Sequence, residues 1–208
     1  GRIEVKLSAP YGDDGSHQHI KLFLNRLPRP LSAVLPVFEN MGVTVLSEQP
    51  FKLSDSNLHI ADFAVQLPRA DALDNESTRH AFIELLEKLL RNEAENDGFN
   101  RLALLAGLDG SRITILRAYG RYLRQAGLHF SQAYIERCLA SYPHIARLLV
   151  DLFAERLSSQ GSDEHAREIS GELDAALVGV SNLDEDHILS GFKTAIEATL
   201  RTNAWQTG

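Results

Sequence analysis

Apolar and polar positions follow two different periodicities along the first hundred residues. Ile3, Val5 and Leu7 alternate with polar residues, as in a half-buried β-strand, whereas from Leu31 the apolar positions recur at helical spacing. Gly42 directly follows this helical run and suits the left-handed turn that ends a helix. The patterns predict the order β, β, α, β, β, α, with strands in 2–7, 20–24, 43–53 and 58–67 and a first helix in 31–41. The second helix follows the polar loop 71–77, carries an apolar stripe from Phe82 to Leu90 and ends near Gly98.

Two positions disturb these patterns. Pro36 lies inside the first helix and lacks the N–H that would bond to Ser32, which predicts a kink or an irregular first turn. In the fourth strand Asp62 falls on the face of Leu58 and Ile60, which favours an edge position or a β-bulge.

From residue 99 onward the spacing is helical, and an echo recurs after twenty residues. Ala106-Gly107-Leu108 returns as Ala126-Gly127-Leu128, and Ser111 returns as Ser131. Each copy predicts a helix end, a glycine cap, a loop and a serine N-cap, unless the echo only reflects the common use of cap residues. Pro143 predicts the start of another helix.

Residues 158–163 (SSQGSD) have the composition of a flexible linker. After them, Ile188 and Phe192 belong to a final helix whose first turn carries Asp184, Glu185 and Asp186, which suits the helix dipole. We therefore expect a strand-containing module over 1–97, a helical domain over 98–157, a linker over 158–170 and C-terminal helices over 171–208.

Composition and charge narrow the class of protein. The 208 residues contain 21 Lys and Arg against 28 Asp and Glu, a net charge of −7, which argues against a general polyanion binder. Cys138 is the only cysteine, so an internal disulfide and a thiolate metal cage are excluded and a cytoplasmic location is expected. Nothing resembles a membrane span or a signal peptide.

The chemistry-bearing residues do not form a recognisable catalytic motif. Nucleotide-binding loops and the common hydrolase and metal signatures are missing, so we expect neither catalytic residues nor a metal site. His17 and His19 could share a metal with Asp13 or Asp14, but a solvated polar loop accounts for them equally well. His59 and Asp62 would point to opposite faces of a regular strand and are interpreted as structural.

A basic stripe is the sharpest charge feature of the second half. Arg117, Arg121 and Arg124 share one helical face, and few aromatic residues interleave with them. Nucleic-acid binding is therefore disfavoured, and we interpret the three arginines as candidates for a contact with another domain or subunit. Cys138 falls in an apolar helical register, which favours an inert core thiol over a nucleophile.

Several stretches resemble a known family. Residues 28–45 (PRPLSAVLPVFENMGVTV) are similar to the strand–helix–strand signature of ACT domains, which are small ferredoxin-like regulatory modules. Together with 60–63 (IADF), 92–102 (NEAENDGFNRL) and 116–125 (LRAYGRYLRQ), they resemble the large bacterial NAD-specific glutamate dehydrogenases. The most specific part is 92–125. The fold class expected is thus α+β, with a ferredoxin-like (ACT-like) antiparallel sheet and two helices followed by an all-helical region.

The resemblance implies one segment of a much longer polypeptide, made of the last ACT-like module and helices that lead toward a catalytic domain. In that family the catalytic region oxidises L-glutamate to 2-oxoglutarate and ammonia with NAD, so NAD is expected in the parent enzyme and no cofactor in this segment. The expected role is regulation and assembly. The expected partners are other domains or subunits of a homo-oligomer, with an amino acid or organic acid as a candidate effector and no membrane.

The strand-to-helix turn is the candidate ligand site that the resemblance implies. ACT modules that bind amino acids usually carry a glycine after the proline of this turn, whereas here Pro28 is followed by Arg29. A bulky cation argues against binding beside the backbone, although its guanidinium could itself hold a carboxylate. The candidate ligand-binding residues are Asn25, Arg26 and Arg29, and the alternative function is a standalone ACT-type amino-acid sensor.

Overall fold

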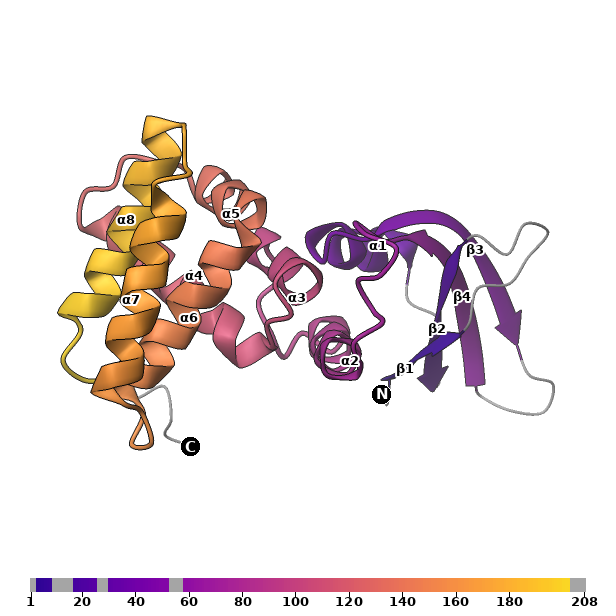
Figure 1. Ribbon diagram of the computed structural model, residues 1–208. Coiled ribbons are helices and arrows are strands. Elements are labelled where there is room, and N and C mark those ends of the chain that lie inside the picture. Colours follow the sequence, from indigo (N-terminus) through magenta and orange to yellow (C-terminus); the bar gives the residue numbers. More distant parts are fainter. Residues whose placement is uncertain (1–2, 9–16, 26–29, 53–57, 203–208) are drawn as a thin grey trace. The chain divides into compact units, whose positions relative to one another are not determined.

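The computed structural model describes residues 3–8, 17–25, 30–52 and 58–202. The chain divides into two compact units, Gly1–Gly110 and Ser111–Gly208. The first unit contains a four-stranded sheet with helices on one side of it, and the second is built from helices (Figure 1).

The first unit has the predicted order of elements. Its sheet has the spatial order β1-β2-β4-β3, and every neighbouring pair is antiparallel. The α+β class expected from the sequence is confirmed. The elements are β1 (Ile3–Ser8), β2 (Gln18–Asn25), α1 (Leu31–Asn40), β3 (Thr44–Lys52), β4 (Leu58–Gln66), α2 (Glu76–Leu90), the 3₁₀-helix η1 (Gly98–Arg101) and α3 (Leu102–Leu105).

The sheet is a rearranged form of the ferredoxin-like fold. In the usual order βαββαβ, one edge of the sheet is formed by the last strand of the chain, which pairs with the first strand. Here β1 occupies that edge, and it pairs with β2 from Ile3 opposite Leu24 to Ser8 opposite His19. The sheet is therefore completed by a strand from the N-terminal side, and after α2 the chain leaves the module directly into η1 and α3.

The fourth strand is not where its pattern predicted. β4 lies in the interior of the sheet, paired with β2 on one side and with β3 on the other. The prediction of an edge position or bulge in β4 was wrong; the register shift lies in β3, between Val45 and Ser47. Asp62 can occupy an interior strand because neighbouring side chains pair with its carboxylate.

The core of the first unit lies between the sheet and helices α1 and α2. Inward-facing strand residues such as Leu22 and Phe63 are almost fully buried, and the ring of Phe38 from α1 lies 5.1 Å from that of Phe63. Phe82 and Leu86 of α2 are likewise buried. At this typical centroid distance, aromatic pairs contribute packing energy beyond their buried area.

Helix α1 ends as its sequence predicts. Gly42 has a φ of +77°, and the N–H of Val43 donates to the carbonyl of Phe38 at 2.9 Å. This bond is the long closing bond of a Schellman cap, and it needs a residue that tolerates a left-handed conformation. Pro36 lies inside α1, and the kink expected there stays a prediction.

The second unit is organised around α6. It contains α4 (Gly110–Gln125, whose first residue belongs to the first unit), α5 (Gln132–Ser141), α6 (Pro143–Leu157), α7 (Asp163–Leu177) and α8 (Leu183–Ala198). Helix α6 packs against α5, α7 and α8, which explains why seven of its residues are buried. Pro143 begins α6, and Asp184, Glu185 and Asp186 form the first turn of α8, as predicted.

Three predictions about helix boundaries need correction. The helix expected to end near Gly98 is α2, which ends at Leu90. The expected linker over 158–170 contains the first half of α7, because the Ser162 side chain accepts from the N–H of His165 and caps a helix that begins at Asp163. In the twenty-residue echo, Gly107 and Gly127 both have positive φ and Ser131 caps α5, but Ser111 lies inside α4.

The division into units also falls later than the boundary expected at residue 97. Helices η1 and α3 belong to the first unit, where η1 packs on α1 and α3 packs on α2. A hydrogen bond between the side-chain amides of Asn40 and Asn96 (3.1 Å) joins the end of α1 to the segment before η1. The first turns of the expected helical domain are thus part of the sheet-containing unit.

Candidate functional site

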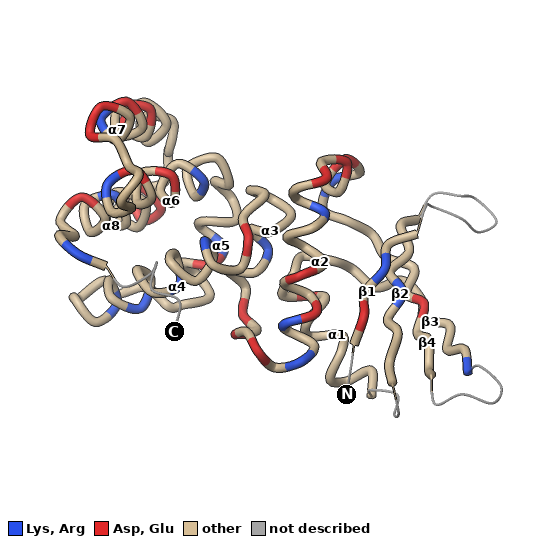
Figure 2. The backbone as a smooth tube through the Cα atoms, turned by 90° about the horizontal axis from the view of Figure 1, so that it is seen from below, with Lys and Arg blue, Asp and Glu red and all other residues tan. Residues whose placement is uncertain are grey.

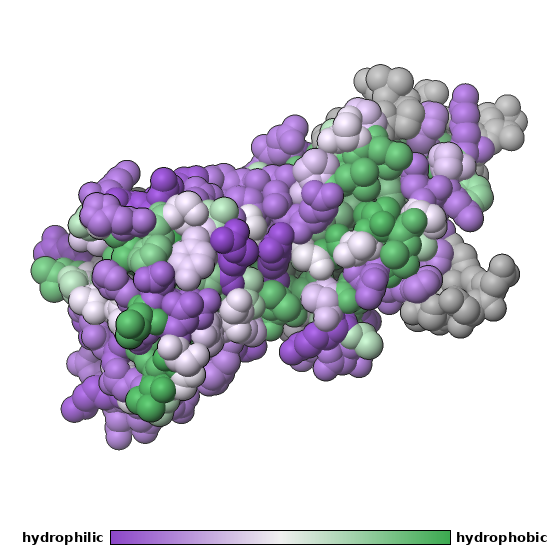
Figure 3. Space-filling model, turned by 90° about the horizontal axis from the view of Figure 1, so that it is seen from above, coloured by the Kyte–Doolittle hydropathy of each residue, from purple (hydrophilic) through white to green (hydrophobic). Residues whose placement is uncertain are grey.

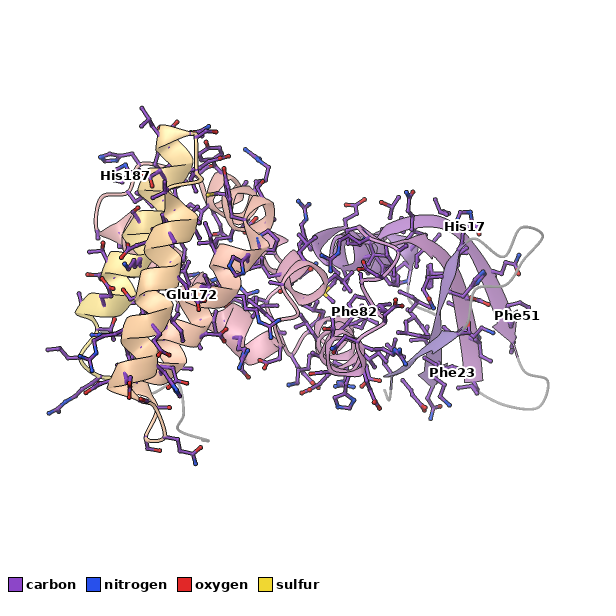
Figure 4. The ribbon with its side chains drawn as sticks, viewed as in Figure 1. His17, Phe23, Phe51, Phe82, Glu172 and His187 are labelled. Atoms are coloured by element: carbon purple, nitrogen blue, oxygen red, sulfur yellow. The ribbon has the colours of Figure 1, made fainter. Side chains whose placement is uncertain are left out.

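Helices α1 and α2 cover one face of the sheet, and no described helix of the first unit covers the other face. Side chains alternate between the faces, so the inward positions of Ile20 and Leu22 leave His19, Lys21 and Phe23 on the opposite face. In Figure 4, Phe82 lies in the helical layer, whereas Phe23 and Phe51 lie at the sheet. Phe51, on the edge strand β3, is 51% exposed.

A charged cluster sits at the centre of this helix-free face. The carboxylate of Asp62 is buried, with the residue only 4% exposed, and its Oδ1 lies 2.9 Å from Nδ1 of His19. Nζ of Lys21 lies 3.6 Å from the other carboxylate oxygen. Asp62 of β4 is directly opposite Lys21 of β2, and His19 is diagonal to it, which are the two positions from which cross-strand side chains interact.

The cluster is better suited to stabilising the sheet than to catalysing a reaction. A buried carboxylate requires partners, and a one-residue slip of β2 against β4 would remove both of them. The cluster therefore favours the observed register. In the described part of the chain, no group of three or more His, Cys, Asp or Glu side chains is arranged to hold a metal ion.

The histidine predictions can be compared with this arrangement. His19 bonds to Asp62, and the proposed metal partners Asp13 and Asp14 lie outside the described residues. Asp62 pairs with His19 and Lys21 of the neighbouring strand, not with His59 of its own strand. The sequence reasoning missed this cluster because only the register between β2 and β4 brings its members together.

The predicted ligand turn is only partly described. Asn25 is exposed at the end of β2, and Arg26 and Arg29 lie outside the described residues. Close in sequence to the turn, Leu24 and Val34 help to line a hollow of about 320 Å³ between the sheet and α1, with Glu48, Lys52 and His59 also in its wall. Binding at this turn stays a prediction.

The three arginines of α4 have different surroundings. Arg117 is buried, and its Nη1 lies 3.4 Å from Oγ1 of Thr114 on the same helix. Arg121 and Arg124 are exposed. Basic segments of α4 are visible in Figure 2, where α7 by contrast carries several acidic segments. Arg121 and Arg124 therefore lie at the surface, where the predicted contact with another domain or subunit would form, whereas Arg117 does not.

Cys138 has the surroundings of a core thiol. It is 1% exposed on α5, and its Sγ lies 3.8 Å from the carbonyl oxygen of Glu185. Burial raises the pKa of the thiol to about 12, with a smaller contribution from the charge of Glu185. The thiolate, which is the nucleophilic form, is strongly disfavoured here.

Family models match two consecutive parts of the chain. A model of the glutamate dehydrogenase ACT3 domain matches residues 2–78, and a model of glutamate dehydrogenase helical motif 3 matches residues 94–159. The chain belongs to the NAD-specific glutamate dehydrogenase family. The ACT3 match includes all four strands and α1, and the helical motif begins just before η1.

Curated NAD-specific glutamate dehydrogenases agree with this assignment. The Halomonas elongata enzyme is 37% identical over 198 residues, the Pseudomonas aeruginosa enzyme 37% over 212 residues and the Mycobacterium tuberculosis enzyme 34% over 215 residues. These matches cover 93–98% of this chain but only 12–13% of the relatives. The chain thus corresponds to one segment of these long glutamate dehydrogenases. None of its described helices is long and apolar enough to cross a membrane.

Proposed function

We propose that this chain is a regulatory and assembly segment of an NAD-dependent glutamate dehydrogenase and performs no chemistry itself. The observation that carries the proposal is the pair of consecutive matches, to an ACT3 domain and to helical motif 3, within a chain that spans 12–13% of its relatives. The whole enzyme would convert L-glutamate, NAD and water to 2-oxoglutarate, ammonia and NADH in the cytoplasm.

The physical reason for a non-catalytic role is the state of the candidate groups. The thiol of Cys138 is buried and protonated, and the carboxylate of Asp62 is occupied by His19 and Lys21. NAD would be bound by other parts of the parent polypeptide. The partners proposed for this segment are those other domains and further subunits of a homo-oligomer, with an amino acid or organic acid as effector.

The exposed arginine pair of α4 is the proposed contact with such a partner. Arg121 and Arg124 lie three residues apart on one helical face, and a guanidinium suits bidentate contacts with carboxylates. Buried Arg117 would support this face from within its own unit.

The test uses the full-length parent enzyme with Arg121→Glu and Arg124→Glu introduced together. We expect the oligomeric state measured by light scattering to shift toward smaller species, because two repulsive charges replace two attractive ones. The matched control is Arg137→Glu, an exposed arginine of the neighbouring helix α5.

Two outcomes would contradict the proposal. The first is NADH formation by the 208-residue chain alone with L-glutamate and NAD, since this would place catalysis inside the segment. The second is an unchanged oligomer and unchanged kinetics in the double variant, which would remove α4 as an assembly contact.

A further inference from the structure

A second hollow lies within the helical unit, where α6, α7 and α8 pack on one another in pairs (Figure 1). Its volume is about 390 Å³, within the range of small-molecule sites. The end of α6, the first half of α7 and the end of α8 supply its polar wall, with the side chains of Arg156, Asp163, Arg167, Ser170 and Glu197. Hydrophilic and apolar residues are mixed on the face of this unit that Figure 3 shows, and the hollow mixes them in the same way.

Two arginines from different helices border this hollow. Arg156 of α6 donates from Nη2 to the carbonyl oxygen of Glu197 at 2.6 Å. Arg167 of α7 donates from Nε to the carbonyl oxygen of Asp163 at 3.1 Å. Each bond holds its side chain in place and uses one of the five N–H donors of the guanidinium. In the described part of the chain neither guanidinium forms an ion pair with a carboxylate, whereas Arg91 of α2 pairs with two.

The carboxylates of the wall leave these guanidinium donors available. Oε1 of Glu197 accepts from the hydroxyl of Ser170 at 2.7 Å and lies 3.7 Å from Nζ of Lys193, a largely buried side chain. The charge of Glu197 is therefore already paired. Asp163 lies in the first turn of α7, where the positive end of the helix stabilises its charge. Two guanidiniums can thus bind an anion, and the carboxylate of Asp163 would partly repel it.

The apolar lining indicates the shape of the anion. Leu152 and Ala166 border the same hollow and are almost fully buried. A guanidinium binds a carboxylate through two parallel hydrogen bonds, so two guanidiniums on separate helices provide for two carboxylates. A hydrocarbon chain that joins the carboxylates suits the apolar lining, whereas inorganic phosphate has no such chain. We propose that this hollow binds a small aliphatic dicarboxylate, with one carboxylate at Arg156 and the other at Arg167.

Such a ligand would join the end of helical motif 3 to the helices that follow it. Arg156 lies in the part matched by the helical motif 3 model, residues 94–159, whereas Arg167 lies beyond it. Occupancy would stabilise the packing of α7 on α6. The reaction proposed for the parent enzyme converts one five-carbon dicarboxylate, L-glutamate, into another, 2-oxoglutarate. The site would therefore make the segment responsive to this class of metabolite, a consequence that rests on the proposed regulatory function.

The experiment measures binding of glutarate to the 208-residue chain by isothermal titration calorimetry and by thermal shift, with ligand in the millimolar range. Two probes each keep part of the ligand: the monoamide of glutarate has the same length and only one carboxylate, and inorganic phosphate is an anion without a hydrocarbon chain. We expect glutarate to raise the unfolding midpoint. Each probe should bind at least about fivefold more weakly, because the monoamide loses a charge-assisted contact and phosphate cannot reach both guanidiniums across the apolar lining.

Variants locate the site. Arg156→Gln and Arg167→Gln should each weaken glutarate binding by at least about fivefold, because one carboxylate loses its partner. Asp163→Asn should instead tighten binding, because it removes a negative charge from the wall. The matched controls are Arg137→Gln on α5 and Glu172→Gln on α7, which are exposed residues of the same unit outside this wall. The midpoint of each variant without ligand shows whether it folds, and the probe series tests the site without any substitution.

The outcomes separate this inference from the proposed function. No heat and no thermal shift with glutarate, equal binding of phosphate or the monoamide, or equal binding by wild type and Arg167→Gln would overturn the hollow as a dicarboxylate site. The regulatory proposal would then still stand on the assembly experiment. If binding depends on both arginines but glutarate affects the parent enzyme and its Arg167→Gln variant alike, the site is upheld and its regulatory consequence is overturned.

Discussion

Cys138 is the only thiol in the chain, and a thiol-specific reagent therefore reports on one position in the core of the helical unit. The pKa of this thiol is raised from 9.0 to about 12, mainly by burial. At pH 8, roughly one unfolded thiol in ten is a thiolate, against roughly one in ten thousand in the folded unit. The shift of 12 − 9 = 3 units corresponds to about 4 kcal/mol, or a thousandfold lower thiolate population.

The assay follows release of the coloured thiolate from Ellman's reagent at pH 8. We expect one equivalent to react at once in guanidinium chloride and the native chain to react at least about a thousandfold more slowly, through transient opening of the unit. Ile135→Ala, a fully buried neighbour on α5, should accelerate the reaction, whereas Val178→Ala, at a position 86% exposed, should not. Reaction of the native chain within the mixing time would refute the buried, protonated thiol.

The raised pKa of Cys138 also predicts how the stability of the protein changes in alkaline solution. Because the folded pKa lies above the unfolded value, the contribution to stability is complete below about pH 9 and is lost as the pH rises toward 12. By pH 10 the loss amounts to roughly 1 kcal/mol. Cys138→Ala should therefore lose less stability than wild type between pH 8 and pH 10 in urea titrations at the two values. Parallel losses would contradict the assigned cause.

Two further predictions concern the sheet-containing unit. Phe38→Ala removes a fully buried ring packed on Phe63 and should lower the unfolding free energy by about 3–5 kcal/mol, whereas Phe51→Ala, at a half-exposed edge position, should cost under about 1 kcal/mol. Asp62→Asn leaves Lys21 and His19 without their carboxylate and should cost about 2 kcal/mol, against under about 0.5 kcal/mol for Asp71→Asn, whose partner is on the surface. Urea unfolding measures all four, and equal losses within either pair would contradict the burial argument.

Local patterns were enough to predict most elements of the fold. These patterns depend on neighbours only a few residues away along the chain. The structure contains the strand predicted from the alternation at Ile3, Val5 and Leu7, the helix cap predicted at Gly42 and the helix start predicted at Pro143. The prediction of a linker was wrong because it also rested on local composition alone. Serine and aspartate are common both in flexible loops and at helix N-caps. At Ser162 the cap prevails, since Glu155 accepts from its N–H and α7 packs on α6.

The interior position of β4 and the charged cluster could not be predicted in this way. Asp62 is placed by pairings with β2 and β3, and its partners His19 and Lys21 lie more than forty positions away along the chain. The position of the Arg101 side chain beside Gly42 depends likewise on η1 packing against the end of α1. Such sites depend on register and packing between distant segments, and a single sequence carries no local signal for either.

The N-terminal edge strand also affects the order in which the molecule can fold during synthesis. With β1 at the edge, all four strands have left the ribosome once Gln66 has emerged, and the covering helix α2 follows by Leu90. In the usual order βαββαβ, the sheet would wait for a strand made after that helix. Because domains form from the N-terminus onward, the sheet and its core can assemble while α5 to α8 are still being made. The sheet of the first unit can thus be complete before the helices of the second unit have been made.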